Sequence, residues 1–461
     1  MRVPFVWAIP VACVVASVSA CTQSSGGVPT ESSGNTLSLE TRLAVESRAG
    51  AGDDSDEVGL RARAAKGLQI SPVPLRTSGL TRRQMLRVGL GSYIVNGTAD
   101  CNGCHGSAAG FLAGGNPFFL DRARHVVWSR NLTPDANTGL TLTEDQFVQT
   151  IRTGKDHLDQ SRMLVVMPWL IYRWMSDEDL KAVYAYLRAV PPAQNAVPPD
   201  NKSDLPLPPA VPFPGKYTDG EIDRRLPYDA RSFSPRRGLA IAPRAHPADL
   251  EDLEDLEDDE LRSYALGSYI ANSMSACNEC HTNPDRTPDS SKINTAAYLS
   301  GGTVFAVPPP LQPVLHQVRA TSANLVGEQY GFFNEPEDSY ARFSAIIHTQ
   351  SHADETPPRP LGFPMVLIAG NLSKVLDEDL RAIYAYVKGV PSVTGAADQP
   401  RQDYARYCQS STDCQAGESC ASNECVGKAC AADVDCDTCQ TCAGGACAAP
   451  ATSSACLASA R

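Results

Sequence analysis

The sequence predicts a mainly α-helical protein, with two tandem copies of one domain followed by a small disulfide-rich module. Two repeated patterns indicate the duplication. The pentapeptide Leu-Gly-Ser-Tyr-Ile stands at residues 90–94 and again at 266–270. A run beginning Asp-Glu-Asp-Leu opens a helical pattern at 177–190 and again at 377–390. The module is indicated by the cysteines, because ten of the 16 lie between residues 408 and 456.

The spacing of the repeats sets the expected limits of the parts. The upstream patterns lie 176 residues apart and the downstream patterns 200 apart, so the second copy carries about 24 extra residues. We expect the first domain at 81–195, the second at 259–395 and the cysteine-rich module at 404–456. We expect a flexible tether at 21–80 before the first domain and a Pro-rich, acidic linker at 196–258 between the two domains. The net charge of −12 argues against nucleic-acid binding.

The N-terminus, residues 1–20, has the pattern of a lipoprotein signal peptide. Arg2 precedes an apolar run at 3–18, and small residues then lead to Cys21. Cys21 is therefore the expected lipidation site of an exported protein, located in the cell envelope or periplasm and anchored to a membrane by lipid. Thr22 follows Cys21 at the place where Asp would resemble an inner-membrane retention signal. Because Thr stands there instead, the sequence favours an outer-membrane lipoprotein. The alternative is an ordinary secretory signal cleaved near Ala20.

Two pentapeptides of the form Cys-x-x-Cys-His lie at 101–105 and 277–281. Two thiols three residues apart, followed at once by His, suit covalent haem attachment, in which the thiols add to vinyl groups and the imidazole ligates iron. A single motif of this kind also arises by chance or in a zinc site, but each copy here stands in a longer repeated frame. The sequence predicts two covalently bound haem c groups, with thioether links at Cys101, Cys104, Cys277 and Cys280 and iron ligands at His105 and His281.

Two helices are expected to close the first haem crevice. Tyr93 lies on a helix that leads into the first Cys-x-x-Cys-His motif, and residues 177–190 form the last helix. Ser176 is the expected N-cap of this last helix, whose first turn is acidic. Gly91 is expected to let the first and last helices approach closely where they cross.

The sixth iron ligand of the first domain must come from between these helices. Met167 is the favoured ligand, because Pro168 holds the chain extended beside it. Met163, Met175 and His157 are the alternatives, Met175 being more suited to packing at the start of the last helix.

Further motifs give the first domain a family resemblance. They are Phe111–Gly115, Asn131–Asp135, Thr143–Phe147, Ile151–Gly154, Met167-Pro168-Trp169 and Ser176–Leu180. Residues 85–195 resemble the class I cytochrome c domains in the cytochrome subunits of bacterial alcohol and sugar dehydrogenases. The resemblance implies Cys101 and Cys104 as thioether sites, with His105 and Met167 as axial ligands. Those subunits usually carry three such domains and this chain has two, so a partnership with an alcohol dehydrogenase is not implied.

The second domain repeats this plan less faithfully. Gly301-Gly302 matches the pair at 114–115, and Asn324-Leu325 matches the pair at 131–132, but the Thr-Pro-Asp that follows in the first copy is absent. Met365 is the only methionine after the second haem motif and is the expected sixth ligand. It lies two residues earlier than the spacing of the last helices predicts, which a two-residue loop insertion explains.

Three histidines are the rival ligands in the second domain: His316, His348 and His352. His348 and His352 lie four residues apart, on one face of an apparent helix. They are a possible ligand pair or acid/base group, although solvated or locally bonded histidines are the commoner case.

The ten C-terminal cysteines allow five disulfides in an exported protein, with a connectivity that spacing does not reveal. Cys436, Cys439 and Cys442 are an alternative zinc or cluster site. Nine acids at residues 249–260 either dock a basic partner or form a solvated helix start.

Two filled haem sites predict an electron carrier rather than an enzyme, because neither iron then has an open position for substrate. The expected partners are a redox protein donor and acceptor. A dihaem peroxidase, with His348, His352 and Glu355 near a displaceable ligand, is the first alternative. A surface-binding protein that works through the cysteine-rich module is the second.

Overall fold

The computed structural model describes residues 55–119, 126–157, 164–201, 231–244, 259–283, 293–353, 355, 358–399, 405–414, 418–427, 441–443 and 446–448. The expected signal peptide and Cys21 lie outside these ranges. The chain forms two compact units. The larger unit holds most of both copies of the repeat; the smaller consists of residues 304–321, 362–364 and the C-terminal part from 405 onward. None of the helices in the described ranges combines the length and apolar character that a membrane span needs.

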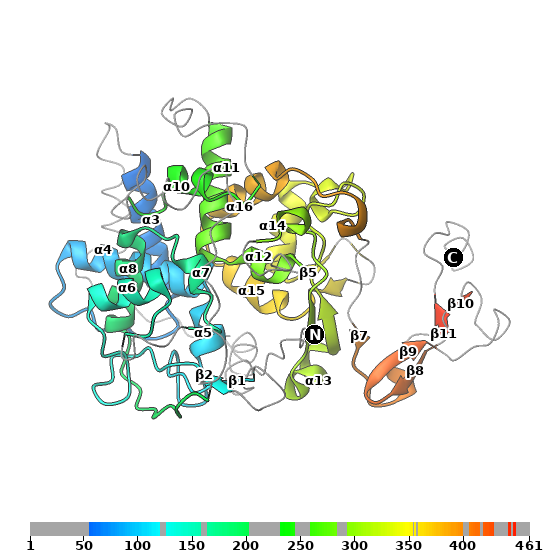
Figure 1. The fold of residues 1–461 in the computed structure, drawn as a ribbon, viewed down its shortest axis with the longest axis horizontal. Helices are drawn as coiled ribbons and strands as arrows, with labels where there is room; N and C mark the ends of the chain where they lie inside the picture. Colours follow the sequence, from blue (N-terminus) through cyan, green and yellow to red (C-terminus); the bar gives the residue numbers. More distant parts are fainter. Residues whose placement is uncertain are drawn as a thin grey trace, which may run out of the picture. The chain divides into compact units, whose positions relative to one another are not determined.

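The first copy is mainly helical, as predicted, and its elements follow one another around the Cys-x-x-Cys-His motif (Figure 1). In chain order they are α4 (Arg82–Tyr93), the π-helical turn η1 (Ile94–Thr98), α5 (Cys101–His105), β1 (Pro117–Phe119), β2 (Val126–Trp128), α6 (Glu144–Thr153), α7 (Trp169–Tyr172) and α8 (Asp177–Ala189). Strands β1 and β2 form an antiparallel pair in which Phe118 lies opposite Val127.

The helix ends are set by local capping. Thr81 and Gln84 form a capping box at the start of α4, which opens with the basic pair Arg82-Arg83. Ser176 caps α8 by accepting the N–H of Asp179, which confirms the predicted N-cap. Helix α6 ends at Gly154, whose φ of 67° lies in the left-handed region that glycine adopts without strain.

The second copy repeats this succession (Figure 1). Its elements in the larger unit are α11 (Asp259–Tyr269), the π-helical turn η3 (Ile270–Met274), α12 (Cys277–His281), η4 (Thr295–Ala297), η6 (Phe332–Asn334), α14 (Tyr340–Thr349), β5 (Ser351–His352), β6 (Arg359–Pro360), α15 (Met365–Leu372), α16 (Asp377–Gly389) and η7 (Gly395–Ala397). The extra residues of this copy stand between the helices that both copies share.

The first and last helices of each copy cross in direct backbone contact, as the sequence predicts for Gly91. A side chain at Gly91 on α4 would overlap the carbonyl oxygen of Ala182 on α8. Gly267 on α11 stands in the same relation to Ala382 on α16. The contact is therefore a repeated feature of the fold.

Two helices were not expected from the sequence: α3 (Ser55–Ile70) lies in the expected tether, and α10 (Pro235–Ala240) lies in the expected linker. Helix α3 packs on α4, and α10 packs on α11. The hydroxyl of Ser92 donates to the Gly67 carbonyl at 2.6 Å, and that of Ser268 donates to the Gly238 carbonyl at 2.6 Å.

These helices correct the expected boundaries, because α3 and α10 are equivalent parts of the two copies. The pattern basic residue-Gly-Leu-x-Ile-x-Pro, at residues 66–72 and 237–243, was the signal for them in the sequence. Each copy therefore begins earlier than predicted.

The smaller unit is built from short strands and two disulfides. Its elements are β3 (Val304–Ala306), η5 (Pro309–Leu311), α13 (Gln312–Leu315), β4 (Gln317–Thr321), β7 (Ala405–Arg406), η8 (Ser411–Asp413), β8 (Glu418–Ala421), β9 (Glu424–Gly427), β10 (Thr441–Ala443) and β11 (Ala446–Ala448). The three-stranded sheet has the order β3-β4-β7, so residues 304–321, which we assigned to the second domain, join the C-terminal part here.

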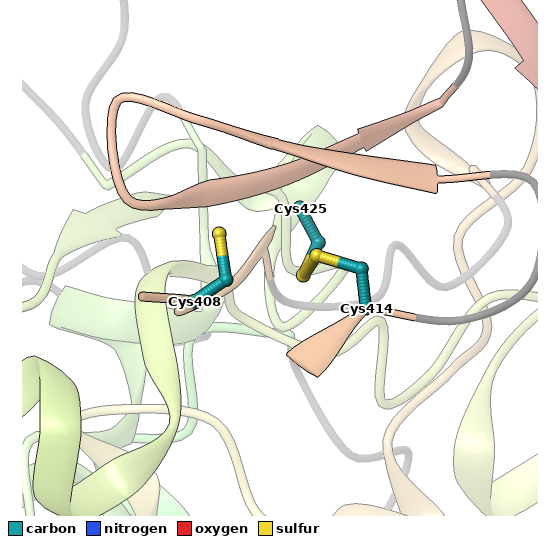
Figure 2. A group of neighbouring side chains, drawn as sticks. All are labelled: Cys408, Cys414 and Cys425. Atoms are coloured by element: carbon teal, nitrogen blue, oxygen red, sulfur yellow. A yellow bond between two sulfur atoms is a disulfide. The ribbon is translucent and has the colours of Figure 1, made fainter. Parts of the chain in front are cut away.

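The disulfides of the smaller unit pair Cys408 with Cys420 and Cys414 with Cys425. Figure 2 shows three of these cysteines side by side, with the bond between Cys414 and Cys425. Disulfides were predicted for this segment, and these two hold it around the β8–β9 hairpin. The possible bonds of the cysteines after residue 427 lie outside the described side chains.

We predict that Gly91→Ala lowers the free energy of unfolding by about 3 kcal/mol, because the added methyl group overlaps the backbone of α8. Gly370→Ala in α15 is the control, since its added atom would make only ordinary contacts of 3.5 Å or more. Denaturant unfolding of both variants measures the effect. Equal stability of the two variants would contradict the close crossing.

Candidate functional site

Each Cys-x-x-Cys-His motif forms a one-turn helix after an irregular end of the preceding helix. The π-helical turns η1 and η3 precede α5 and α12. A left-handed residue then resets the chain direction, namely Asp100 with φ 46° and Ala276 with φ 51°. In each turn the two cysteines stand three residues apart, which places them on one side of the helix. The same local device therefore presents both motifs.

The four motif cysteines are free and partly buried. Burial raises the pKa of Cys101 and of Cys104 to about 12, and the charge of Asp100 adds to this effect. Burial also raises the pKa of Cys277 to about 11 and that of Cys280 to about 12. No disulfide joins these four cysteines, so their sulfur atoms are free to form thioether bonds.

The two motif histidines are held by backbone carbonyls. Nδ1 of His105 lies 2.7 Å from the carbonyl oxygen of Arg130, and Nδ1 of His281 lies 2.9 Å from that of Ala323. A carbonyl only accepts, so Nδ1 carries the proton and Nε2 keeps its lone pair. Burial lowers the pKa of both histidines, which favours the neutral ring. A neutral imidazole oriented in this way is the usual ligand for haem iron.

Paired glycines bring these carbonyls within reach. Gly114 and Gly301 have φ values of 69° and 73°, and their N–H groups donate to the carbonyls of His105 and His281, each at 2.7 Å. A side chain at Gly114 would overlap the backbone of Arg130. The Gly-Gly pairs seen in the sequence therefore permit the close approach that orients each imidazole. Thiols, imidazole and glycine turn together fit a covalently attached haem in both copies.

The two methionines expected as sixth ligands occupy related places. Met167 lies two residues before α7, where Pro168 is the N-cap, and Met365 is the first residue of α15. Both side chains are partly buried against the core. Their ligation to iron stays a prediction.

The other candidates of the first copy are placed differently. Met175 is 4 % exposed within the core, in keeping with a packing role. His157 is partly buried, and Met163 lies outside the described residues.

The expectation that His348 and His352 share a helix is wrong. Helix α14 ends at Thr349, because Gln350 adopts φ 55°, and His352 lies on strand β5. His348 is exposed, and its Nδ1 lies 2.8 Å from the carbonyl oxygen of Ser344. His348 is therefore a locally bonded surface residue.

His352 is the rival that remains in the larger unit with a buried side chain. It is 7 % exposed, and its ring lies 6.2 Å from that of Phe332. Its Nδ1 is 3.9 Å from Glu355, which pairs with Arg359 at 2.9 Å. His316, the third rival, is exposed at the end of α13 in the smaller unit.

The two Cys-x-x-Cys-His turns lie near each other within the larger unit. The Thr98 hydroxyl, three residues before the first motif, lies 3.5 Å from the sulfur of Met274, three residues before the second. Tyr172 donates to the Ala99 carbonyl at 3.3 Å. Burial raises the pKa of Tyr172, and the acidic groups of Asp100, beside the first motif, and of Glu279, in the second motif, add to the effect. Nothing in the local patterns indicated this proximity.

The cysteine cluster of the smaller unit does not have the chemistry of a zinc site in this state. The sulfurs of Cys408, Cys414 and Cys425 lie within 4.8 Å of one another (Figure 2). All three are in disulfides, whereas zinc binds thiolates. For the sequence-based zinc candidate, the structure describes only the backbone of Cys442, in β10, and neither Cys436 nor Cys439.

Comparison with models of protein families finds no match. Three similar proteins are cytochrome subunits of dehydrogenases. The gluconate 2-dehydrogenase cytochrome c subunit of Pantoea cypripedii is 25% identical over 350 residues, which cover 73% of this chain and 67% of that protein. The fructose dehydrogenase cytochrome subunit of Gluconobacter japonicus is 26% identical, covering 64% and 51%. The alcohol dehydrogenase (quinone) cytochrome c subunit of Gluconacetobacter polyoxogenes is 24% identical, covering 66% and 56%.

These similarities support a cytochrome c-subunit family and imply covalently bound haem c. The chain spans between about half and two thirds of the length of these three relatives. They agree with the resemblance seen in the sequence, and they extend over more of the chain than the first copy alone.

We predict that Gly114→Ala raises the midpoint potential of one haem. The strained, crowded turn would move the Arg130 carbonyl away from His105, and the imidazole would become a weaker donor to ferric iron. Spectroelectrochemical titration measures the midpoint potential of each bound haem. Gly395→Ala is the control, because Gly395 has a similar φ of 66° with nothing within 4 Å of the added atom. An unchanged pair of potentials in Gly114→Ala would show that the carbonyl does not tune the ligand.

Proposed function

We propose that this chain is an exported dihaem c-type cytochrome that relays electrons between redox partners in the cell envelope. The observation that carries the proposal is the duplicated site. Each copy presents two free cysteine thiols and an imidazole whose Nδ1–H is fixed by a carbonyl. The relatives, which are cytochrome subunits, support the same function.

The proposed haem sites use eight side chains. The first comprises Cys101, Cys104, His105 and Met167, and the second comprises Cys277, Cys280, His281 and Met365. The haem supplies a reversible one-electron change at iron. The protein contributes covalent attachment, a neutral imidazole of fixed orientation and, through the methionine thioether, a raised potential. With both axial positions filled, neither iron binds substrate, so the chain acts as a carrier rather than a catalyst.

The proposed location follows from the N-terminal sequence. Lipidation at Cys21 would hold the chain at a membrane, where its local concentration near a membrane-bound partner is high. The donor and acceptor are proposed to be redox proteins of the same compartment. The dehydrogenase subunits named by the comparisons illustrate one such kind of partnership.

We predict that the purified protein carries two haems and that Cys101→Ala with Cys104→Ala carries one. The thioether links of one site are independent of the thiols of the other, because each site has its own motif. Intact-mass measurement, together with the haem absorbance per chain, counts the haems. The double variant Cys277→Ala with Cys280→Ala is the matched counterpart, with the same expected count. A wild-type chain without covalent haem would overturn the proposed function.

We predict that Met167→Ala and Met365→Ala each convert one low-spin haem to a high-spin haem of lower potential, because the thioether ligand is lost. Magnetic circular dichroism of the oxidised protein reports the axial ligands. Met175→Ala, at a buried methionine of the core, is expected to leave both signatures unchanged.

The same experiment separates the relay from a dihaem enzyme. In Met365→Ala a peroxidase is expected to keep its turnover, whereas a relay is expected to show a lower midpoint potential at one haem. A second haem that stays low-spin in this variant would reject Met365 as ligand and leave buried His352 as the next candidate.

A further inference from the structure

The tyrosine of each Leu-Gly-Ser-Tyr-Ile repeat reaches the other copy. In the first copy, Tyr93 at the end of α4 lies at the start of α16 of the second copy. Its hydroxyl accepts the N–H of Leu376 at 2.9 Å and donates to the carboxylate of Asp379. Leu376 is the N-cap of α16 and has no side-chain hydroxyl to offer. The phenol of one copy therefore completes the helix start of the other.

The second copy makes the reciprocal contact. The hydroxyl of Tyr269, at the end of α11, accepts the N–H of Ser176 at 2.7 Å and donates to Asp179 at 2.5 Å. Both bonds lie at the start of α8 in the first copy. We refer to Tyr93, Tyr269, Asp179 and Asp379 as the tyrosine latch. The two copies thus hold each other through equivalent residues, as the subunits of a symmetric dimer do.

All four latch side chains are buried, each with 0 % exposure. A buried carboxylate is stable only when both of its oxygens accept hydrogen bonds. This holds for Asp179 and for Asp379. Asp379 is paired with Arg63 of α3, whose Nε and Nη2 donate at 2.9 Å and 2.5 Å. Breaking such a contact leaves a buried polar group unsatisfied, which costs more than the same change at a surface.

Asp179 is bonded differently, although it occupies the equivalent place. It accepts from the hydroxyls of Ser176 and Ser232 and from the N–H of Phe233 at 3.1 Å. Burial raises the pKa of Asp179, and the hydrogen bonds from Ser232 and Tyr269 act in the opposite direction. The latch therefore has one half with an arginine ion pair and one half bonded by hydroxyl and amide donors.

The latch stands directly before the haem-attachment turns. Tyr93 is followed by η1 and Tyr269 by η3, and these π-helical turns meet at Thr98 and Met274. The helix that begins with the proposed ligand Met365 adds a further bond across the copies. Asn371 on this helix donates to Asp100, next to the first motif, at 2.7 Å. Displacement at the latch would consequently move one attachment turn relative to the other.

We propose that the tyrosine latch consists of positioning residues that fix the two haems relative to each other, so that electrons pass directly between them within one chain. This inference rests on the proposed function. In each transfer one ferrous iron becomes ferric while the other ferric iron becomes ferrous, with no bond broken and no proton moved. Tunnelling between fixed centres depends steeply on their separation, so the protein acts through position and orientation.

The test is the rate of electron exchange between the haems in the full-length dihaem protein. Photoreduction of one haem, followed by time-resolved absorbance, measures it in Tyr93→Phe, Tyr269→Phe and the double variant. Phenylalanine keeps the ring and removes only the hydroxyl. We expect electron exchange in the double variant to be at least about tenfold slower than in the wild type. We also expect both haems to stay bound, with unchanged spectroscopic signatures of their axial ligands.

The matched control is Tyr184→Phe with Tyr384→Phe. These tyrosines are also a repeated pair on α8 and α16, but their hydroxyls bond within their own copy, to the Leu142 carbonyl at 2.8 Å and to Asp338 at 3.0 Å. We expect the exchange rate of this variant to equal that of the wild type. An unchanged rate in the latch variant, or an equal loss in the control, would overturn the proposal.

A second measurement needs no variant. Pulsed dipolar EPR of the oxidised wild-type protein gives the distribution of iron–iron distances. One narrow distribution supports the latch, and a broad one contradicts it even if the double variant does not accumulate. A chain without haem contradicts the proposed function itself, whereas two reducible haems that exchange no electrons with each other contradict only the latch.

Discussion

The close crossing of α4 with α8, repeated by α11 with α16, is the constraint from which the rest of the larger unit follows. At Gly91 the backbones of α4 and α8 touch because no side chain separates them, and at Gly267 the same holds for α11 and α16. Two residues later on the same helix stands the tyrosine that reaches the other copy. One turn of helix therefore joins the parts of one copy and also joins the two copies. Any side chain at the crossing would disturb both sets of contacts.

The two copies keep the same bonds where the geometry is shared and differ where charge is involved. Asn96 donates to the Tyr186 hydroxyl at 2.9 Å, and Asn272 donates to the Tyr386 hydroxyl at the same distance. In the latch, by contrast, Arg63 neutralises one buried aspartate, and Ser232 stands beside the other. A duplicated interface thus tolerates different solutions to the burial of a carboxylate, provided that each oxygen is bonded.

Much of the candidate site was predictable because its signals are local. The Cys-x-x-Cys-His pentapeptides and the N-cap Ser176 act within a few residues. Each pentapeptide forms one helical turn, and Ser176 caps α8 as predicted. The sequence could not show which aspartate Tyr93 contacts. The Tyr and the Asp are both repeated, and their spacing is the same whether each Tyr contacts the Asp of its own copy or that of the other copy. Helix α3 was not predicted because its sequence is charged and has a weak apolar pattern. One of its charged side chains, Arg63, is nevertheless buried.

The second copy was less predictable for a related reason. Its strands β3 and β4 pair in a sheet with β7, which is distant in the sequence, so a boundary drawn from the repeat divides residues that fold together. The left-handed Gln350 ends helix α14 after Thr349, and this separates His348 from His352. Side chains other than glycine seldom adopt this conformation, so composition gives little warning of it.

The ion pair between Arg63 and Asp379 also bears on the order in which the protein is assembled. Its two residues are separated by 316 positions, almost the whole length of the larger unit. During synthesis the arginine emerges long before its carboxylate, and contacts between such distant segments form late. The ion pair of Arg63 therefore forms only after residue 379 has been made, and a chain truncated before this residue leaves the buried guanidinium without its carboxylate partner. The surroundings of this buried arginine are thus completed by one of the last-made segments of the larger unit.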